Sequence, residues 1–198
     1  MALGNNKRFL TILPITACIL LFAVPSLFSV QENRQPDSDA YAKLEIAFDY
    51  QRRNGIASNQ FAVWIEDASG ALVKTLYATQ FTATGGWEKR PACLPEWVAS
   101  ARPDTLSSRE VDALTGATPV SGRLRYAWDG KDHDGRRVPS GIYRYIVEAN
   151  LRWNKRVVYS GMIALGGPVQ AARPQPEYFG EADGDRGMIS NVVVSYRP

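Results

Sequence analysis

The residue types best suited to chemistry lie within one short stretch that ends at Thr118. Asp112 brings a carboxylate and Thr115 brings a second hydroxyl, while Gly116 and Ala117 leave the backbone open to close approach. A threonine hydroxyl is a weak nucleophile, so it reacts only where a base or a metal ion activates it. The stretch therefore predicts a residue that is modified in the site of another enzyme.

The segment from Asp112 to Thr118 resembles the flavinylation motif Asp-x-x-(Ser/Thr)-Gly-Ala-(Ser/Thr). In proteins with this motif, a flavin transferase takes FMN from FAD and joins it to the last Ser or Thr. The resemblance implies covalent FMN, linked to Thr118 by a phosphodiester. It also implies that Asp112 and Thr115 position the segment by hydrogen bonds, or that Asp112 contacts the transferase's metal ion. Gly116 and Ala117 would let the transferase and the flavin phosphate approach.

Two tryptophans, Trp87 and Trp97, are candidates for contact with the flavin because they lie in the same irregular segment as Thr118. An indole face suits stacking on a flat ring system. The alternative is that both indoles pack this segment onto the rest of the fold. The sequence leaves these two roles open.

The chain lacks the groups for several common catalytic or metal sites. His133 is the only histidine, which argues against a Ser-His-Asp hydrolase and, with Cys93, against a structural zinc site. Asp132, Asp134 and Gly135 match part of a calcium loop, but the full ligand set is missing, so a turn is the preferred interpretation. We therefore predict no catalytic residue and no metal ligand, and a carrier in preference to an enzyme with its own substrate.

Segments with the two-residue period of half-buried strands surround the irregular segment. Leu44, Ile46, Phe48 and Tyr50 alternate onto one face of the first of these. The expected strands span 43–50, 61–65, 72–81, 123–128, 142–153, 156–165 and 191–196, with a hairpin turn at 154–155. This pattern predicts an all-β fold, an immunoglobulin-like sandwich of about seven strands.

The irregular segment is an insertion at 82–122, rich in glycine and proline, in which only short helices are expected. Pro95 is suited to the first position of one helix. Ser107 and Glu110 have the spacing of a capping box for a second helix, and Gly116 is expected to end that helix as a left-handed residue. An insertion of this length in a compact sandwich more often serves function than decoration.

The N-terminal residues 1–30 have the basic start and apolar run of a signal peptide, and 9–30 are also long enough to remain as a membrane anchor. A lipidation site at Cys18 is a third, weaker alternative. Residues 31–40 are polar and predict a linker, so that 41–198 form the sandwich domain. Export is common to all three alternatives.

Charge and cysteine content exclude further classes of protein. The net charge is +3, and without Lys7 and Arg8, the only charged residues before Glu32, it is +1. A balance so close to neutral gives no electrostatic basis for binding nucleic acid. Cys93 is the only cysteine beyond Cys18, so an internal disulfide in the mature domain is excluded and its stability must come from its core.

Most of the mature chain resembles a family of predicted periplasmic proteins of unknown function. The resemblance runs from Tyr41 to Tyr196 and is carried by residues 45–52, 58–67, 73–79, 85–91, 94–97 and 111–118. It implies a flavin-bearing electron carrier that meets a flavin transferase and a membrane electron-transfer protein. The alternative hypothesis is a non-redox module that binds another envelope protein. A sandwich that binds carbohydrate or metal through the turn at 129–134 is a weaker third.

Overall fold

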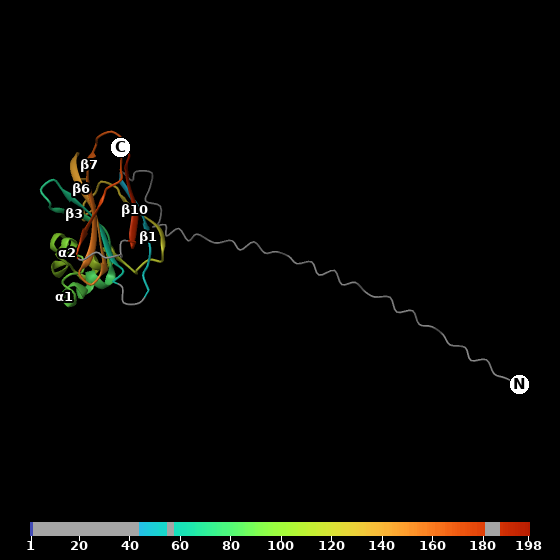
Figure 1. Cartoon of the computed structure of the whole chain (residues 1–198). Helices are drawn as coiled ribbons and strands as arrows, with labels where there is room; N and C mark the ends of the chain where they lie inside the picture. Colours follow the sequence, from blue (N-terminus) through green and yellow to red (C-terminus); the bar gives the residue numbers. More distant parts are fainter. Residues whose placement is uncertain (2–43, 55–57, 181–186) are drawn as a thin grey trace. The chain divides into compact units, whose positions relative to one another are not determined.

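The computed structural model describes residue 1 and residues 44–54, 58–180 and 187–198 (Figure 1). Two β-sheets face each other. The first sheet has the order β5 (Gly122–Trp128), β1 (Leu44–Tyr50), β10 (Ile189–Tyr196), β8 (Gln170–Ala172). The second has the order β4 (Thr115–Gly116), β3 (Leu72–Thr79), β2 (Gln60–Asp67), β6 (Gly141–Arg152), β7 (Lys155–Leu165), β9 (Pro176–Phe179). All neighbours are antiparallel except β3 and β4, which run parallel.

The predicted all-β sandwich is confirmed, and each expected strand is present. The short strands β4, β8 and β9 were not predicted, because two to four residues are too few to show a period. The hairpin between β6 and β7 turns at Trp153 and Asn154, one residue earlier than expected, since Arg152 pairs with Lys155. The expectations for residues 1–30 and 31–40 lie outside the described residues. None of the helices in the described part of the chain has the length and apolarity needed to cross a membrane.

The core between the sheets follows from the alternation along the strands. The predicted inward face of β1 is almost fully buried, from Leu44 to Tyr50 at 2% exposure or less. Aromatic side chains from both sheets meet there: the Phe48 ring lies 5.7 Å from the Phe61 ring and 5.8 Å from the Tyr126 ring, measured between centroids. Burial of this much aromatic area is a main source of stability for a domain without a disulfide.

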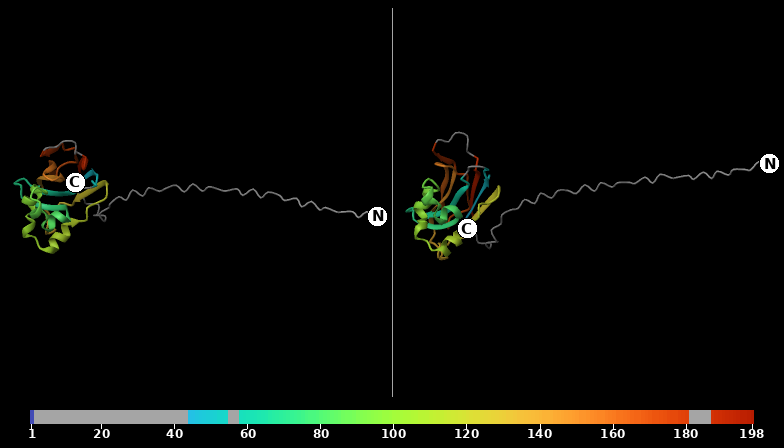
Figure 2. Two further views of the ribbon diagram at one scale, coloured as in Figure 1. Left: turned by 60° about the horizontal axis from the view of Figure 1, so that its bottom comes forward. Right: turned by 90° about the horizontal axis from the view of Figure 1, so that it is seen from below.

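The insertion covers the outer face of the six-stranded sheet with η1 (Thr82–Gly86), α1 (Trp87–Lys89), α2 (Pro95–Ala101), η2 (Pro103–Thr105) and α3 (Ser108–Leu114). Figures 1 and 2 show these segments, in green, gathered against one side of the sandwich. A second apolar cluster forms there between Trp64 and Ile146 of the sheet and Leu94 and Trp97 of the insertion. The sheet is therefore buried on both faces, which explains why every residue of β2 up to Glu66 is buried.

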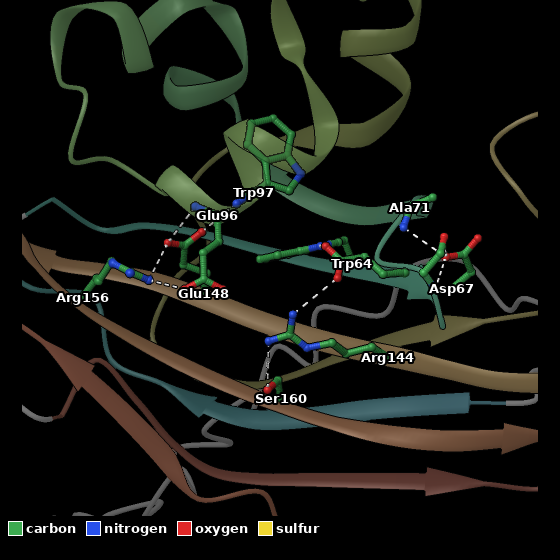
Figure 3. A network of polar contacts seen from close by, with 11 residues as sticks. Trp64, Asp67, Ala71, Glu96, Trp97, Arg144, Glu148, Arg156 and Ser160 are labelled. Atoms are coloured by element: carbon green, nitrogen blue, oxygen red, sulfur yellow. Dashed lines mark hydrogen bonds and ion pairs between the residues drawn. The ribbon is translucent and has the colours of Figure 1, made fainter.

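A buried carboxylate on the sheet binds the start of α2 (Figure 3). Glu148 accepts hydrogen bonds from the backbone N–H of Trp97 (2.9 Å) and of Glu96 (3.4 Å). Arg156 lies 3.3 Å from the Glu148 carboxylate and 2.6 Å from that of Glu96, and its guanidinium stacks 3.7 Å over the Phe179 ring. Burial raises the pKa of Glu148 to about 7, although the Trp97 N–H and the Arg156 charge act in the opposite direction.

Helix α3, whose last turn contains the first residues of the motif, begins as predicted but ends in a different way. The capping box is present: the Ser107 hydroxyl accepts from the Glu110 N–H (3.3 Å), and the Glu110 carboxylate accepts from the Ser107 N–H (2.8 Å). The expectation that Gly116 ends α3 as a left-handed residue is wrong. Helix α3 stops at Leu114 because the chain turns extended at Thr115, where φ is −106°, and then pairs with β3.

Candidate functional site

The motif lies where the chain crosses from one sheet to the other. Strand β4 is the edge of the six-stranded sheet and β5 is the edge of the four-stranded sheet. Residues 117–121 join these two edges, so Thr118 sits in the link across one side of the sandwich. At its far end, the Ser121 hydroxyl accepts from the Arg52 N–H at 2.9 Å. Both ends of the link are therefore held, and between them Thr118 is half-buried, Pro119 is buried and Val120 is exposed.

Pairing with β3 fixes the first half of the motif. Thr115 and Gly116 pair with Ala78 and Thr79. The Tyr77 hydroxyl lies 3.0 Å from the Ala117 carbonyl oxygen and 3.3 Å from that of Gly116, so it donates to this pair of acceptors. A Cβ atom on Gly116 would lie 2.9 Å from Cε2 of Tyr77. Glycine is thus needed for close approach to the Tyr77 ring, not for a positive φ.

A pocket of about 350 Å³ opens beside this half of the motif. We call it the edge pocket, and its lining residues are Leu76, Tyr77, Ala113, Leu114, Thr115, Gly116, Ala117, Pro119, Leu124, Arg125 and Tyr126. It therefore lies between the edges of the two sheets. Its size is at the lower end of the range for small-molecule sites, about 300–1,000 Å³.

Two tyrosine rings form the aromatic wall of the edge pocket. The centroids of Tyr77 and Tyr126 are 5.2 Å apart, with the rings tilted by 39°. Tyr77 stacks in turn on Phe61 at 4.7 Å and Tyr126 on Phe48 at 5.8 Å, so the core supports both rings. Burial raises the pKa of both tyrosine hydroxyls well above the usual value, which keeps them neutral.

A bulge in β3 explains why adjacent residues line the same pocket. Val63 pairs with Tyr77 while its neighbour Trp64 pairs with Thr75, which leaves Leu76 as the extra residue. A bulge of this kind redirects side chains that would otherwise alternate between faces. Both Leu76 and Tyr77 consequently reach the edge pocket, which simple alternation does not predict.

Among the described residues that line the edge pocket, the one cation is Arg125, which is exposed on β5. Its guanidinium lies 3.1 Å from the Glu45 carboxylate of the neighbouring strand β1. An exposed pair of this kind contributes little to stability. The guanidinium nevertheless gives the rim of the pocket a positive group to face an anionic ligand.

The motif's carboxylate lies at a different pocket. Asp112 is exposed and lines a second pocket of about 310 Å³, which also has Trp87, Glu88 and Asp104 in its lining. We call this the acidic pocket, because it contains three carboxylates and no basic residue. Thr118 is half-buried, and within the described part of the chain no hydrogen bond engages its hydroxyl. The motif thus spans two pockets, with its acceptor hydroxyl unengaged.

The predicted tryptophans are not at the edge pocket. Trp97 is fully buried beneath α2, and its indole N–H donates to the Thr75 hydroxyl at 3.1 Å, so it packs the insertion onto the sheet. Trp87 is half-buried in the acidic pocket. The aromatic residues that do flank the motif, Tyr77 and Tyr126, were missed, because they lie on strands about 40 and 10 residues away in sequence.

Contacts made by Asp132 stabilise the turn at 129–134. The Asp132 carboxylate accepts from the backbone N–H groups of Asp134 and Arg136, at 2.9 and 2.8 Å, and pairs with the Arg136 side chain. Across the residues that the structure describes, no three His, Cys, Asp or Glu side chains cluster as a metal site would need. These contacts favour the interpretation of the segment as a turn.

Comparison with known proteins gives one match. The family described as predicted periplasmic protein (DUF2271) matches residues 42–178, more than half of the chain. No curated protein and no solved structure matches. The matched range contains the insertion, the motif and the lining of the edge pocket.

Proposed function

The chain belongs to this family of predicted periplasmic proteins, and from that premise we propose that it is an exported flavoprotein that carries electrons on FMN joined to Thr118. The observation that carries the proposal is the place of the motif: its last threonine is half-buried on the link between the two sheet edges, beside an aromatic pocket. The partners of such a carrier would be a flavin transferase and a membrane electron-transfer protein.

Access for the transferase supports this role. Asp112, Ala113 and Ala117 are exposed, and the Thr118 hydroxyl has no competing hydrogen bond within the described residues. A second enzyme could therefore reach the hydroxyl and activate it without unfolding the domain. The buried ring of Pro119 and the pairing of Thr115 with β3 hold the segment in place on either side of Thr118.

The shape of the site supports covalent attachment over tight reversible binding. The edge pocket is small and open at the rim of the sandwich. A covalent link maintains an effective concentration on the order of millimolar, so a shallow site is sufficient to hold the ring. Outside the cytoplasm, a flavin that dissociated would not be readily replaced. Attached FMN would supply the electron-accepting and electron-donating chemistry, and the chain's own residues would hold and orient it.

Intact mass tests the proposal. Wild type, Thr118→Ala and Thr118→Ser are each co-expressed with a flavin transferase. The intact mass and the in-gel flavin fluorescence of each exported protein are then measured. We expect a gain of one FMN minus water in wild type and in Thr118→Ser, which keeps the hydroxyl, and no gain in Thr118→Ala. No gain in wild type, with the transferase active on a control substrate, would refute the proposal.

The rival function is a non-redox interaction module, and one surface feature favours it. Phe81 and Trp153 are 41% and 60% exposed. The Arg90 guanidinium lies between them, 6.0 Å from the Phe81 ring centroid and 5.6 Å from that of Trp153. Exposed aromatic and arginine side chains are common at protein interfaces. This alternative would remain if Thr118 received no flavin.

A further inference from the structure

We infer that the flavin ring attached at Thr118 docks in the edge pocket against Tyr77 and Tyr126, and not in the acidic pocket beside Trp87. The inference rests on the proposed function, because it takes the covalent FMN as its ligand. It goes further by assigning the ring a binding site on the protein. Four features of the described residues support it: the attachment point, the ring chemistry, the charge and the rigidity of the pocket.

The attachment point is flanked by residues of the edge pocket, although Thr118 itself is not in the pocket lining. Ala117 and Pro119, on either side of Thr118, both line that pocket. The acidic pocket is lined by Asp112 but by no residue that follows it in the chain. A phosphate and ribityl chain attached to Thr118 therefore starts between two residues of the edge pocket, whereas the last residue of the acidic pocket, Asp112, precedes Thr118 in the chain.

The walls of the edge pocket suit a flat apolar ring. Tyr77 and Tyr126 form an aromatic wall, of which the half-buried Tyr77 is the more accessible part, and Leu76 and Leu124 add aliphatic surface. Aromatic groups prefer offset or tilted stacking at centroid distances of about 4.5–7 Å. Each tyrosine already contacts the other and a phenylalanine, so an incoming ring would contact the part of this cluster left exposed, mainly at the half-buried Tyr77.

The two pockets differ more in the charge of their lining than in their size. FMN carries an anionic phosphate, and a reduced flavin gains negative charge on its pyrimidine side. Among the described residues, the lining of the edge pocket has Arg125, which also pairs with Glu45 outside the lining, and no carboxylate. The acidic pocket has Glu88, Asp104 and Asp112 and no cation. Opposite charges within several ångströms favour the ligand in the first pocket and disfavour it in the second.

The edge pocket is also formed before any ligand enters. The Tyr77 hydroxyl is bound to the motif's carbonyl groups, and its ring is stacked on Phe61. Tyr126 is only 6% exposed and rests on Phe48. Because the core holds both rings, docking costs little side-chain ordering.

Fluorescence of the covalently loaded protein tests this assignment. Tyrosine and tryptophan donate an electron to an excited flavin on contact and quench its emission, whereas phenylalanine does not. We compare loaded wild type, Tyr126→Phe and the matched control Trp87→Phe, with the FMN content of each confirmed by intact mass. No hydrogen bond engages the Tyr126 hydroxyl among the described residues, so this variant keeps the fold.

We expect dim flavin emission in the wild type, a several-fold increase in Tyr126→Phe, and no change in Trp87→Phe. Quenching by added iodide should also be weaker than for free FMN, which reports shielding without any substitution. The inference would be overturned if the loaded protein were as bright and as iodide-accessible as free FMN, or if the emission increased only in Trp87→Phe. Either result would leave the proposed function intact. Absence of the FMN mass would overturn the proposed function as well, so the two failures are distinguishable.

Discussion

The insertion is attached to the sandwich in two different ways, at α2 in its middle and at the motif near its last residues, and we call these regions the α2 end and the motif end. The α2 end is anchored by a fully buried indole, Trp97, and by the buried carboxylate of Glu148, which binds two backbone N–H groups of α2. The motif end is held by a two-residue strand and by one tyrosine hydroxyl, and most of its side chains are exposed or half-buried. The comparison teaches that the two ends have separate roles. The α2 end fixes the insertion to the sheet, and the motif end leaves Thr118 accessible.

The largest expected effect is at the anchored end. Trp97→Ala should destabilise the domain by about 3–5 kcal/mol, because it leaves a cavity between α2 and the sheet and an unpartnered Thr75 hydroxyl. Chemical denaturation of the exported protein measures this loss. The matched change at the other end, Thr118→Ala, should alter the free energy of unfolding by less than about 0.5 kcal/mol. Equal losses of unfolding free energy in the two variants would contradict this division of roles between the α2 end and the motif end.

The anchored end should also respond to pH. The raised pKa of Glu148, about 7, means that the folded protein keeps a proton which the unfolded chain releases near the ordinary value of 4.5. This group's contribution to stability is therefore complete below 4.5 and lost as the pH rises through about 7, an effect on the order of 3 kcal/mol at most.

Denaturation of wild type and Glu148→Gln between pH 5 and 8 tests this dependence. The wild-type free energy of unfolding should fall across this range, and the fall should be smaller in the variant, which has nothing to titrate at that position. Glu110→Gln is the matched control, because the Ser107 hydroxyl and N–H lower the pKa of Glu110 and place its titration outside the range. Parallel curves for wild type and Glu148→Gln would show that Glu148 does not titrate as its burial requires.

At the motif end, Gly116→Ala should have an intermediate effect. The added Cβ would meet the Tyr77 ring at 2.9 Å, so the ring or β4 must move, at a cost of about 1–3 kcal/mol. Displacement of β4 should also slow flavin loading at Thr118. Ala127→Ser, at an exposed position of β5 outside the motif and outside the lining of both pockets, is the control and should leave both stability and loading unchanged. A neutral Gly116→Ala would mean that the close approach to Tyr77 has no energetic consequence.

The smallest expected effect is that of Tyr77→Phe. It removes the hydroxyl that binds the Ala117 and Gly116 carbonyl groups, worth about 0.5–1.5 kcal/mol. The link at 117–121 should then be cut faster in limited proteolysis, while α2 is unaffected. Tyr126→Phe keeps the ring and loses no internal hydrogen bond among the described residues, so its cleavage rate should match that of wild type. The same rate in all three proteins would show that Tyr77 does not hold the link.

Local signals allowed much of the fold to be predicted. Alternation along Leu44 to Tyr50 and its counterparts identified the long strands, since a half-buried strand must place apolar residues at every second position. The capping box at Ser107 identified the start of α3, because its donors and acceptors are only three residues apart in the chain. The short strand at Thr115 was beyond this reasoning, since its pairing is decided by β3.

The sequence by itself determined the β-sandwich, the place of the insertion and the motif that ends at Thr118, because each depends on residues close together in the chain. Only the tertiary structure decided which aromatic groups flank the motif. Tyr77 and Tyr126 come from opposite sheets, and their rings meet at 5.2 Å because the two sheets pack face to face there. Trp97, an equally reasonable candidate by sequence, is instead buried under α2, because contacts between distant residues depend on packing and not on spacing.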